Sequence, residues 1–468
     1  MSRRHELAAV AALALAAVVV WALVPTYPNY DAYYHLAWGR ELLDGQSPSF
    51  EAYKAPTQHP LYLVIAALLG ALTGAGADRA LVLLTALSLV ALVWAVFRTG
   101  RAVFGVWPGV VSAALTGSSF ALLLYAARAY VDIPFLALVF WAAALEAQHP
   151  RRGARVMVLL ALAGLLRPEA WVLAGLYWMW CARRPGWKPG LLALALAGPV
   201  MWSLVDASVT GDPLHSLHAT SDLAGELGRE RGLGAIPGAL VSYLADTLRP
   251  PVLLAALGGV VIAWRRRAGR SLHVPAALLG VGLLTFIATG VAGLSVLPRY
   301  LTVPAVTLTL PAGYALAGWA ELPAWAPVRR RWALTVGVLA LIGSGFVATR
   351  LSVVDRFTTE LRYVRAVHDD LGAALDSGAV AAGRRCGPVT FPNYRLVPDA
   401  RWILDASRDE VGARSAKRRE RGVAVFYADR KTLRRFGFAD GASPRTNAPD
   451  AGFERAGRHG RITVYVAC

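Results

Sequence analysis

Residues 7–24 read LAAVAALALAAVVVWALV, and residues 25–45 continue with PTYPNYDAYYHLAWGRELLDG. The first stretch carries no charge, and about 18 apolar residues is the length at which a sequence becomes a candidate membrane span. It follows the basic pair Arg3-Arg4, and no small-x-small cleavage site comes after it. We therefore expect an uncleaved signal anchor with a cytosolic N-terminus, followed by an aromatic outer loop.

The composition of the whole chain agrees with a membrane protein. Hydrophobic residues make up 56% of the 468 positions and charged residues 17%, against about 25% charged in an average soluble protein. This excludes an ordinary soluble enzyme, a disordered chain and a fibrous protein. The net charge of +18 is typical of nucleic-acid binding. However, most basic residues before residue 350 form short clusters between apolar runs, as the positive-inside rule predicts, so we expect no nucleic acid partner.

Following these clusters along the chain predicts a polytopic α-helical protein in the cell membrane. About eleven crossings are expected, at residues 7–24, 80–97, 106–125, 133–147, 156–166, 171–181, 191–205, 251–264, 275–293, 301–319 and 332–348. Residues 156–166 and 171–181 are short and form the two arms of a hairpin. The apolar run 59–74 is expected to lie on the outer face or to dip in and return, and residues 206–249 form a long outer loop.

The last part of the chain is polar and basic, so we expect two domains, a membrane domain over residues 1–349 and a soluble extracytoplasmic domain over residues 350–468. The second domain reads as small α/β. A helix is expected at 358–376, and β-branched and aromatic runs predict strands at 389–391, 402–404, 423–427 and 462–466. Cys386 and Cys468 both lie in this outer domain, where disulfides form, so we expect them to pair. Cys181 lies at a cytosolic helix end and is expected to be a free thiol.

Ionisable residues in the outer loops and near the outer helix ends are the candidates for chemistry. Asp31 and His35 are four residues apart and share one face of an amphipathic helix that would lie at the membrane surface. Asp31 is also a good helix N-cap, and that role alone is the alternative explanation. Lys54 and His59 follow in the same outer segment, and His35, Lys54 and His59 are assigned to substrate binding.

A second group comes from the ends of later spans. Asp132 lies near Arg128, Arg167 and Glu169 stand at the hairpin apex, and Arg299-Tyr300 precede a span. Ionisable groups at membrane depth are costly and often mark functional sites. The alternatives are a structural ion pair for Arg167 and Glu169, and a snorkelling arginine with an interfacial aromatic for Arg299 and Tyr300.

Together these residues predict a water-accessible outer cavity that contains carboxylates and arginines. Such a cavity suits a lipid-linked phosphosugar, whose tail lies in the bilayer and whose headgroup lies at the surface. Arginines bind phosphate through charge-assisted hydrogen bonds, and a carboxylate can take the proton from an acceptor hydroxyl that attacks the anomeric carbon.

The order and sidedness of several short motifs resemble the GT-C-type integral membrane glycosyltransferases, in particular the branch of protein mannosyltransferases and lipid A aminoarabinose transferases. The resemblance covers about residues 7–349. The motifs are 30–34 (YDAYY), 42–45 (LLDG), 59–62 (HPLY), 97–105 (FRTGRAVFG), Asp132 before Ile133-Pro134, 165–169 (LLRPE) and 299–304 (RYLTVP). One departure is Ala32, where protein mannosyltransferases usually have Glu after the first-loop Asp, so the acceptor stays open.

This resemblance implies a sugar donor carried on polyprenyl phosphate and an inverting single-displacement transfer on the extracytoplasmic face. It implies that Asp31 is the catalytic base and that Asp132 positions the acceptor or the base. It implies that Arg299 holds the donor phosphate, with Lys54 and Arg167 as further candidates. The acceptor would be an envelope glycan, lipid or protein. No cofactor is required, although some relatives bind a divalent ion.

Other functions stay open from the sequence. The first is a transporter or flippase of a lipid-linked or anionic substrate, although no inverted repeat of the transporter kind is found. The second is a non-catalytic envelope scaffold. His215 and His218 are three residues apart and could bind a metal, but a solvated loop pair is the simpler explanation, so we assign no metal ligands.

Overall fold

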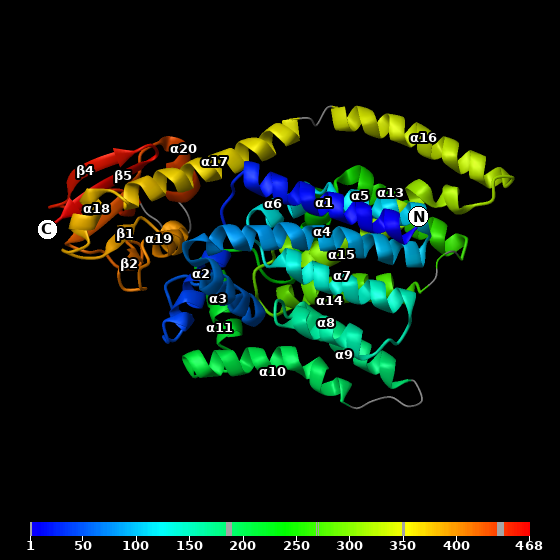
Figure 1. Ribbon diagram of the computed structural model, residues 1–468, viewed down its shortest axis with the longest axis horizontal. Helices are drawn as coiled ribbons and strands as arrows, with labels where there is room; N and C mark the ends of the chain where they lie inside the picture. Colours follow the sequence, from blue (N-terminus) through cyan, green and yellow to red (C-terminus); the bar gives the residue numbers. More distant parts are fainter. Residues whose placement is uncertain (1, 184–189, 268, 270, 349–351, 438–443) are drawn as a thin grey trace. The chain divides into compact units, whose positions relative to one another are not determined.

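The computed structural model describes residues 2–183, 190–267, 269, 271–348, 352–437 and 444–468 (Figure 1). The chain divides into two compact units. Unit 1 contains Met1–Val24, Leu83–Leu204 and Glu230–Phe357, and unit 2 contains Pro25–Val82, Val205–Arg229 and Thr358–Cys468. The expected boundary between residues 349 and 350 lies outside the described residues. Unit 2 therefore combines the first outer loop with the C-terminal residues, which the sequence had placed in separate domains.

Helices dominate the chain as far as residue 348. They are α1 (Arg3–Leu23), α2 (Tyr30–Leu43), α3 (Pro60–Thr73), α4 (Ala77–Val103), α5 (Val106–Gly117), α6 (Phe120–Ala127), α7 (Asp132–Gln148), α8 (Ala154–Gly164), α9 (Glu169–Ala182), α10 (Leu191–Thr210), α11 (His215–Glu226), α12 (Ile236–Leu248), α13 (Pro250–Arg265), α14 (His273–Val291), α15 (Thr302–Ala317) and α16 (Pro327–Ala348). The region 206–249, expected as a long outer loop between two crossings, thus contains α11 and α12, and its side of the membrane stays a prediction.

Helix α15 is the centre of unit 1. Nearly all of its residues are buried, and it packs against α5, α13 and α14. In contrast, α1 exposes large apolar side chains such as Leu15 and Leu23, as expected for a helix in contact with lipid. A helix that is hydrophobic all round needs an apolar environment, so this unit has the surface of a membrane protein.

Within the described residues, five helical segments are long and apolar enough to cross a membrane. Two bent pairs, α5 with α6 and the α12 region with α13, raise this number to seven if each pair is one span. The segment Pro60–Val103 counts as one of the five and contains α3 and α4, joined by a 3-10 turn at Gly74–Gly76. Helices α8 and α9 pack against each other as the expected hairpin, and the number of crossings stays a prediction.

Most of helix α2 is buried within unit 2. Its N-cap is Asn29, whose Oδ1 accepts a hydrogen bond from Ala32 N at 3.0 Å. Eight consecutive residues, 32–39, are buried. Gly39 lets α3 approach closely, since a Cβ there would lie 2.7 Å from the backbone nitrogen of Ala67. Helices α3 and α19 cover α2, and the expected position of α2 at the membrane surface stays a prediction.

The C-terminal part of unit 2 contains a five-stranded mixed sheet with the order β2-β1-β3-β5-β4 (Figure 1). Strand β1 is parallel to β2 and β3, while β5 is antiparallel to β3 and β4. The elements of this part are α17 (Ser352–Leu375), α18 (Gly378–Gly383), β1 (Val389–Phe391), α19 (Val397–Ile403), β2 (Val411–Ala413), β3 (Gly422–Tyr427), α20 (Arg430–Thr432), β4 (Glu454–His459) and β5 (Ile462–Ala467). The core contains Phe391, Val425 and Val464 from the strands and Leu371 and Leu375 from α17.

Three strand expectations differ from the structure, because one expected strand is helical and two strands, β2 and β4, were not predicted. Residues 402–404 belong to the end of α19 and are not a strand, because Pro398 lies in the first turn, where its fixed φ favours a helix start. Strand β4 was missed because its residues are mostly charged and exposed. Charges on an edge strand oppose pairing with another chain, so the feature that protects this edge also hides the strand in the sequence.

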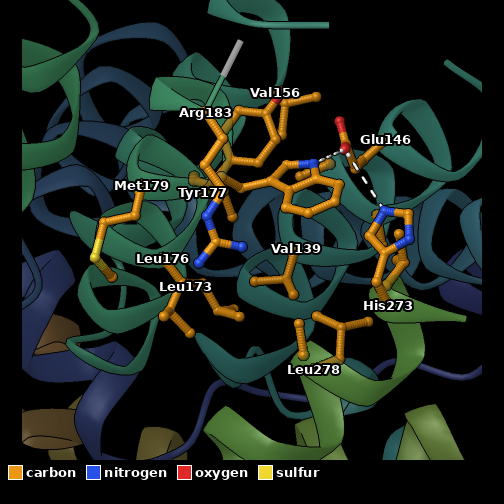
Figure 2. Close-up of a pocket in the computed structure, with 16 residues that line it drawn as sticks. Val139, Glu146, Val156, Leu173, Leu176, Tyr177, Met179, Arg183, His273 and Leu278 are labelled. Carbon is orange, nitrogen blue, oxygen red and sulfur yellow. Dashed lines mark hydrogen bonds and ion pairs between the residues drawn. The ribbon is translucent and has the colours of Figure 1, made fainter. Parts of the chain in front are cut away.

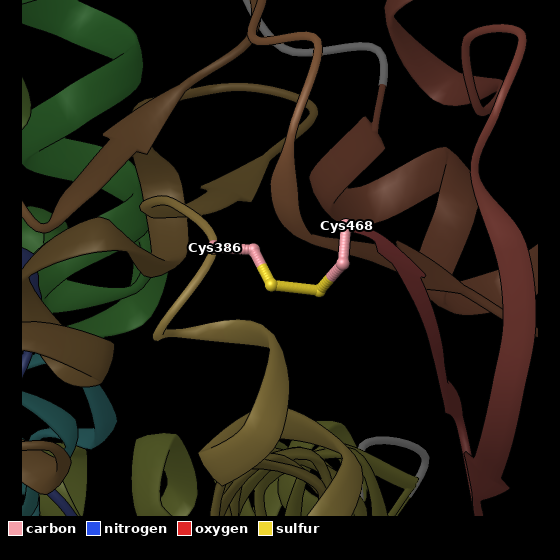
Figure 3. Close-up of a disulfide and its surroundings, with 2 residues drawn as sticks. All are labelled: Cys386 and Cys468. Atoms are coloured by element: carbon pink, nitrogen blue, oxygen red, sulfur yellow. A yellow bond between two sulfur atoms is a disulfide. The ribbon is translucent and has the colours of Figure 1, made fainter.

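Cys386 and Cys468 form a disulfide with a Cα–Cα distance of 5.3 Å, and it joins the segment after α18 to the last residue (Figure 3). Replacing both with Ser should lower the free energy of unfolding by about 2–5 kcal/mol, because the bond restricts the unfolded chain over a separation of 82 residues. Thermal unfolding and non-reducing electrophoresis after thiol alkylation check this. Cys181→Ser, which removes a buried free thiol, is the matched control and should leave the mobility shift on reduction unchanged.

Candidate functional site

Unit 1 holds a buried ionic cluster of Asp132, Arg167 and Glu169, hereafter the Arg167 cluster. Arg167 lies in the connection between α8 and α9, and its side chain is 4% exposed. Its Nη1 pairs with Asp132 Oδ1, and its Nη2 lies 2.6 Å from Glu169 Oε1. The hairpin therefore holds its arginine against the first residue of α7, and the structural ion pair that the sequence left open is present.

The carboxylates of the cluster outnumber its arginine. Asp132 is fully buried, and its Oδ2 has no hydrogen-bond partner among the described residues. A buried carboxylate oxygen without a donor is costly. The charge of Arg299 also acts on Asp132 and on Arg167, so two arginines balance two carboxylates in this region.

Two aromatic rings lie beside the guanidinium of Arg167. The Arg167 guanidinium carbon lies 5.2 Å from the ring centroid of Tyr300 and 5.6 Å from that of Phe135. Arg299 lies 5.8 Å from the Tyr300 ring. The structure thus brings together five of the residues selected from the sequence, namely Asp132, Arg167, Glu169, Arg299 and Tyr300. Arg128 is the C-cap of α6.

One residue of this region, Tyr125, was not predicted from the sequence. Tyr125, at the end of α6, stacks on Tyr130 with a centroid distance of 4.6 Å and is influenced by the charges of Asp132, Arg299 and Arg167. A tyrosine one helical turn before the Arg128-Ala129-Tyr130 sequence was the available signal, but it was taken as part of an ordinary span.

Unit 2 holds the other candidates. Asp31 is the second residue of α2 and partly exposed. Since Asn29 caps the helix, the expectation that Asp31 is the N-cap was wrong, and capping does not account for its presence. A carboxylate in the first turn is still favoured by the helix dipole.

His35 is fully buried and joins two segments of unit 2. Its Nδ1 lies 2.7 Å from the backbone oxygen of Asp31, and its Nε2 accepts a hydrogen bond from His59 N at 3.0 Å. The ring is therefore a neutral imidazole with its proton on Nδ1. Burial lowers the pKa of His35 from 6.5 to about 4. This pattern gives His35 a positioning role at the start of α3, and its predicted contact with substrate stays a prediction.

Folding stability should depend on pH through His35. The unfolded histidine takes up a proton as the pH falls below about 6.5, whereas the folded one does so only near 4. The contribution of the neutral His35 to the free energy of unfolding is complete above pH 6.5. It declines as the pH falls toward 4, by about 3 kcal/mol in total. Thermal unfolding in detergent at pH 7.5 and pH 5 checks this. His35→Gln should flatten the decline, and an equally steep decline in that variant would contradict the assignment.

Lys54 is held in an ion pair. Its Nζ lies 2.5 Å from Glu226 Oε2 in α11, and its side chain is 6% exposed. Near this pair, Gln58 Nε2 donates to the buried Asp206 at 3.1 Å, and Asp206 also accepts from Ser216 N at 2.9 Å. Lys54 thus fixes the first outer loop against α11, which weakens its case as a ligand of the donor phosphate.

Unit 2 also contains a cavity of about 270 Å³, hereafter the Tyr34 cavity. Tyr34 from α2, Tyr53 from the first loop and Arg401 from α19 line it, together with Arg408 and Lys417. Arg401 is 1% exposed and pairs with Glu41 at 2.6 Å, and its Nε has no hydrogen-bond partner in the described part of the chain. Glu51 and Asp409 line it as well, so the cavity offers tyrosine rings and charged groups of both signs for a polar ligand.

In the part of the chain that the structure describes, no three His, Cys, Asp or Glu side chains lie close enough together to hold a metal ion. His215 and His218 lie in α11 and not in a loop, and His218 Nδ1 lies 2.7 Å from Asp212 Oδ2. The metal requirement stays untested.

Two solved structures share the fold of this chain. The structure is similar to that of ArnT from Cupriavidus metallidurans in the apo state, with a TM-score of 0.54 and 14% identity over 97% of both chains. The chain has the GT-C fold. It also resembles the Archaeoglobus fulgidus oligosaccharyltransferase tethered to an acceptor peptide, with a TM-score of 0.52 and 13% identity over all of this chain and 74% of that one. No protein-family model and no curated protein sequence matches the chain.

The GT-C fold agrees with the resemblance noted in the sequence. ArnT is an aminoarabinose transferase, and both neighbours are GT-C glycosyltransferases. Because both identities are low, the likeness establishes the fold, and the activity of this GT-C chain has to be argued from its residues.

Proposed function

We propose that this chain is a membrane glycosyltransferase that moves a sugar from a polyprenyl-phosphate donor to a cell-envelope acceptor on the extracytoplasmic face, with inversion. The observation that carries the proposal is the convergence of Asp132, Arg167, Glu169, Arg299 and Tyr300 within a GT-C fold. A buried arginine between two carboxylates, beside a second arginine and a tyrosine, suits a phosphorylated ligand better than an apolar one.

The reaction is a single displacement. Asp31 accepts the proton of an acceptor hydroxyl, and the hydroxyl oxygen forms a bond to the anomeric carbon. The bond between that carbon and the phosphate oxygen breaks, and polyprenyl phosphate leaves with the electron pair. Arg299 binds the departing phosphate, whose charge needs fixed positive groups more than it needs a proton. Arg167, already paired with Asp132 and Glu169, is a positioning residue.

The Tyr34 cavity is the proposed site for the acceptor. Tyr34 and Asp31 are three residues apart on α2, so their side chains lie on neighbouring positions of one helix face. The tyrosine faces suit a sugar ring, and the charged groups of both signs in the lining can hydrogen-bond to its hydroxyls. The acceptor hydroxyl would then lie within about one helical turn of the proposed base.

The disulfide between Cys386 and Cys468 supports an extracytoplasmic position of residues 350–468, because such bonds persist in oxidising compartments. The N-terminus would be cytosolic, and the spans would contact membrane lipids. The transfer uses no cofactor, and a divalent cation would act only as an additional ligand of the phosphate.

A donor panel tests the function. Purified wild-type protein in lipid is incubated with several polyprenyl-phosphate sugars and crude envelope extract, with and without EDTA, and release of polyprenyl phosphate is followed. Release from one donor supports the proposal and identifies the sugar, and sensitivity to EDTA reports a metal requirement. If no donor is consumed while labelled donor crosses sealed vesicles, the chain is a transporter and the proposal is wrong.

A further inference from the structure

A second cavity, of about 290 Å³, lies within unit 1 among α7, α8, α9 and α14 (Figure 2). We call it the Glu146 cavity. Ligand pockets begin at about this size. It is remote from the Arg167 cluster, since Asp132 begins α7 and Glu146 lies fourteen residues further along the same helix, about 21 Å at 1.5 Å per residue.

The wall of the Glu146 cavity is mostly apolar. Val139, Leu160, Leu173 and Leu278 line its interior. Leu176 and Met179 also line it and are 40% and 48% exposed, on a helix whose surface is otherwise hydrophobic. These exposed side chains place an apolar opening on the outside of the helix bundle, where lipid chains are available.

The polar end of the cavity is not free to bind a cation. Glu146 accepts hydrogen bonds from Arg151 N at 2.8 Å and from Trp180 Nε1 at 2.8 Å. His273 Nε2 lies 3.7 Å from the Glu146 carboxylate (Figure 2). The carboxylate thus accepts hydrogen bonds from α9 and from the turn after α7, and His273 of α14 lies close to it. Glu146 therefore holds α9 and the turn after α7 together at this end of the cavity.

Arg183 supplies the charge that a ligand would meet. It is the C-cap of α9, lines the cavity and is exposed, and its side chain has no hydrogen bond or ion pair with the described residues. In Figure 2 its side chain turns in among the lining residues. An apolar cavity with an arginine at its edge complements a molecule with a hydrocarbon chain and an anionic headgroup.

We propose that the Glu146 cavity binds an anionic phospholipid, with an acyl chain among α7, α9 and α14 and the phosphate at Arg183. Basic pockets between membrane helices bind anionic headgroups, and each arginine near the surface adds about 1 kcal/mol of attraction. This site is separate from the proposed donor site because it lies at the opposite ends of α7 and α9. It requires no transfer activity and therefore stands independently of the proposed function.

Full-length protein in detergent, titrated with phosphatidylglycerol or phosphatidylcholine and analysed by native mass spectrometry, tests this proposal. We expect one tightly bound phosphatidylglycerol and weaker binding of phosphatidylcholine. Arg183→Gln should reduce the affinity for phosphatidylglycerol about fivefold and remove the preference. Ala277→Phe, at an exposed lining position, should weaken both lipids by filling the cavity. Arg331→Gln, an exposed arginine on α16 outside the cavity, is the matched control and should change neither.

Equal binding of the two lipids, with no effect of Arg183→Gln, would overturn the proposal. So would displacement of bound phospholipid by polyprenyl phosphate at lower concentration, because the cavity would then hold a donor chain. Ala277→Phe keeps the test decisive if Arg183→Gln proves unstable.

Discussion

Asp31→Asn should lower the rate of sugar transfer about 10²–10⁴-fold, the range that a positioned general base contributes. The substitution keeps the volume of the side chain but removes the group that accepts the proton. Donor affinity should be nearly unchanged, because the proposed phosphate ligand is Arg299. Helix α2 should persist, since Asn29 caps it. Single-turnover rates together with donor binding isotherms measure the two effects separately.

The matched control for this substitution is Asp44→Asn. Asp44 is the C-cap of the same helix and exposed, so the charge change is identical while the proposed base remains. A wild-type transfer rate in Asp31→Asn would remove Asp31 from the mechanism. If Asp31→Asn instead lowers the unfolding temperature and Asp44→Asn does not, the lost rate reports a structural role of Asp31.

Arg167→Met should destabilise the protein by about 3–5 kcal/mol, because it leaves the buried Asp132 and the partly buried Glu169 without their shared cation. Methionine replaces much of the volume of arginine, so the loss reports the charge and not a cavity. The expected signs are a lower unfolding temperature in detergent and a reduced yield of folded protein.

A neutral triple variant tests whether charge is the cause. Asp132→Asn, Arg167→Met and Glu169→Gln together remove both carboxylates with the arginine, and replacing a complete buried ion cluster is often neutral. We expect the triple variant to recover most of the stability but not transfer. If it is as unstable as Arg167→Met alone, packing at the hairpin apex and not the ionic balance holds this region.

The sequence predicted most helices because apolar length and flanking arginines are local signals. The hairpin of α8 and α9 follows from two short runs around Arg167-Pro168-Glu169. Strand β4 and helix α19 were misjudged because local composition opposed the final structure. Charged residues form much of the edge strand β4. Trp402 and Ile403 favour strands but end helix α19, whose first turn contains Pro398.

The site was predictable as a set of residues but not as contacts. Spacing suggested an interaction between Asp31 and His35, but the histidine binds the backbone oxygen of Asp31 and links α2 to His59. Lys54 pairs with Glu226, 172 residues away in sequence, which no local pattern indicates. The position of Tyr125 near the Arg167 cluster likewise depends on packing between helices that are distant in the sequence. The same holds for the two cavities, because a single sequence does not specify such packing.

The central claim is that the chain cleaves a polyprenyl-phosphate sugar and transfers the sugar to an acceptor. The most direct measurement uses donor labelled in both the sugar and the lipid, with purified protein in sealed vesicles and envelope acceptor. We predict that the sugar label enters the acceptor while an equal amount of labelled polyprenyl phosphate is released, and that Asp31→Asn abolishes both. Intact donor that crosses the membrane with both labels together, at the same rate in wild type and Asp31→Asn, would contradict the account.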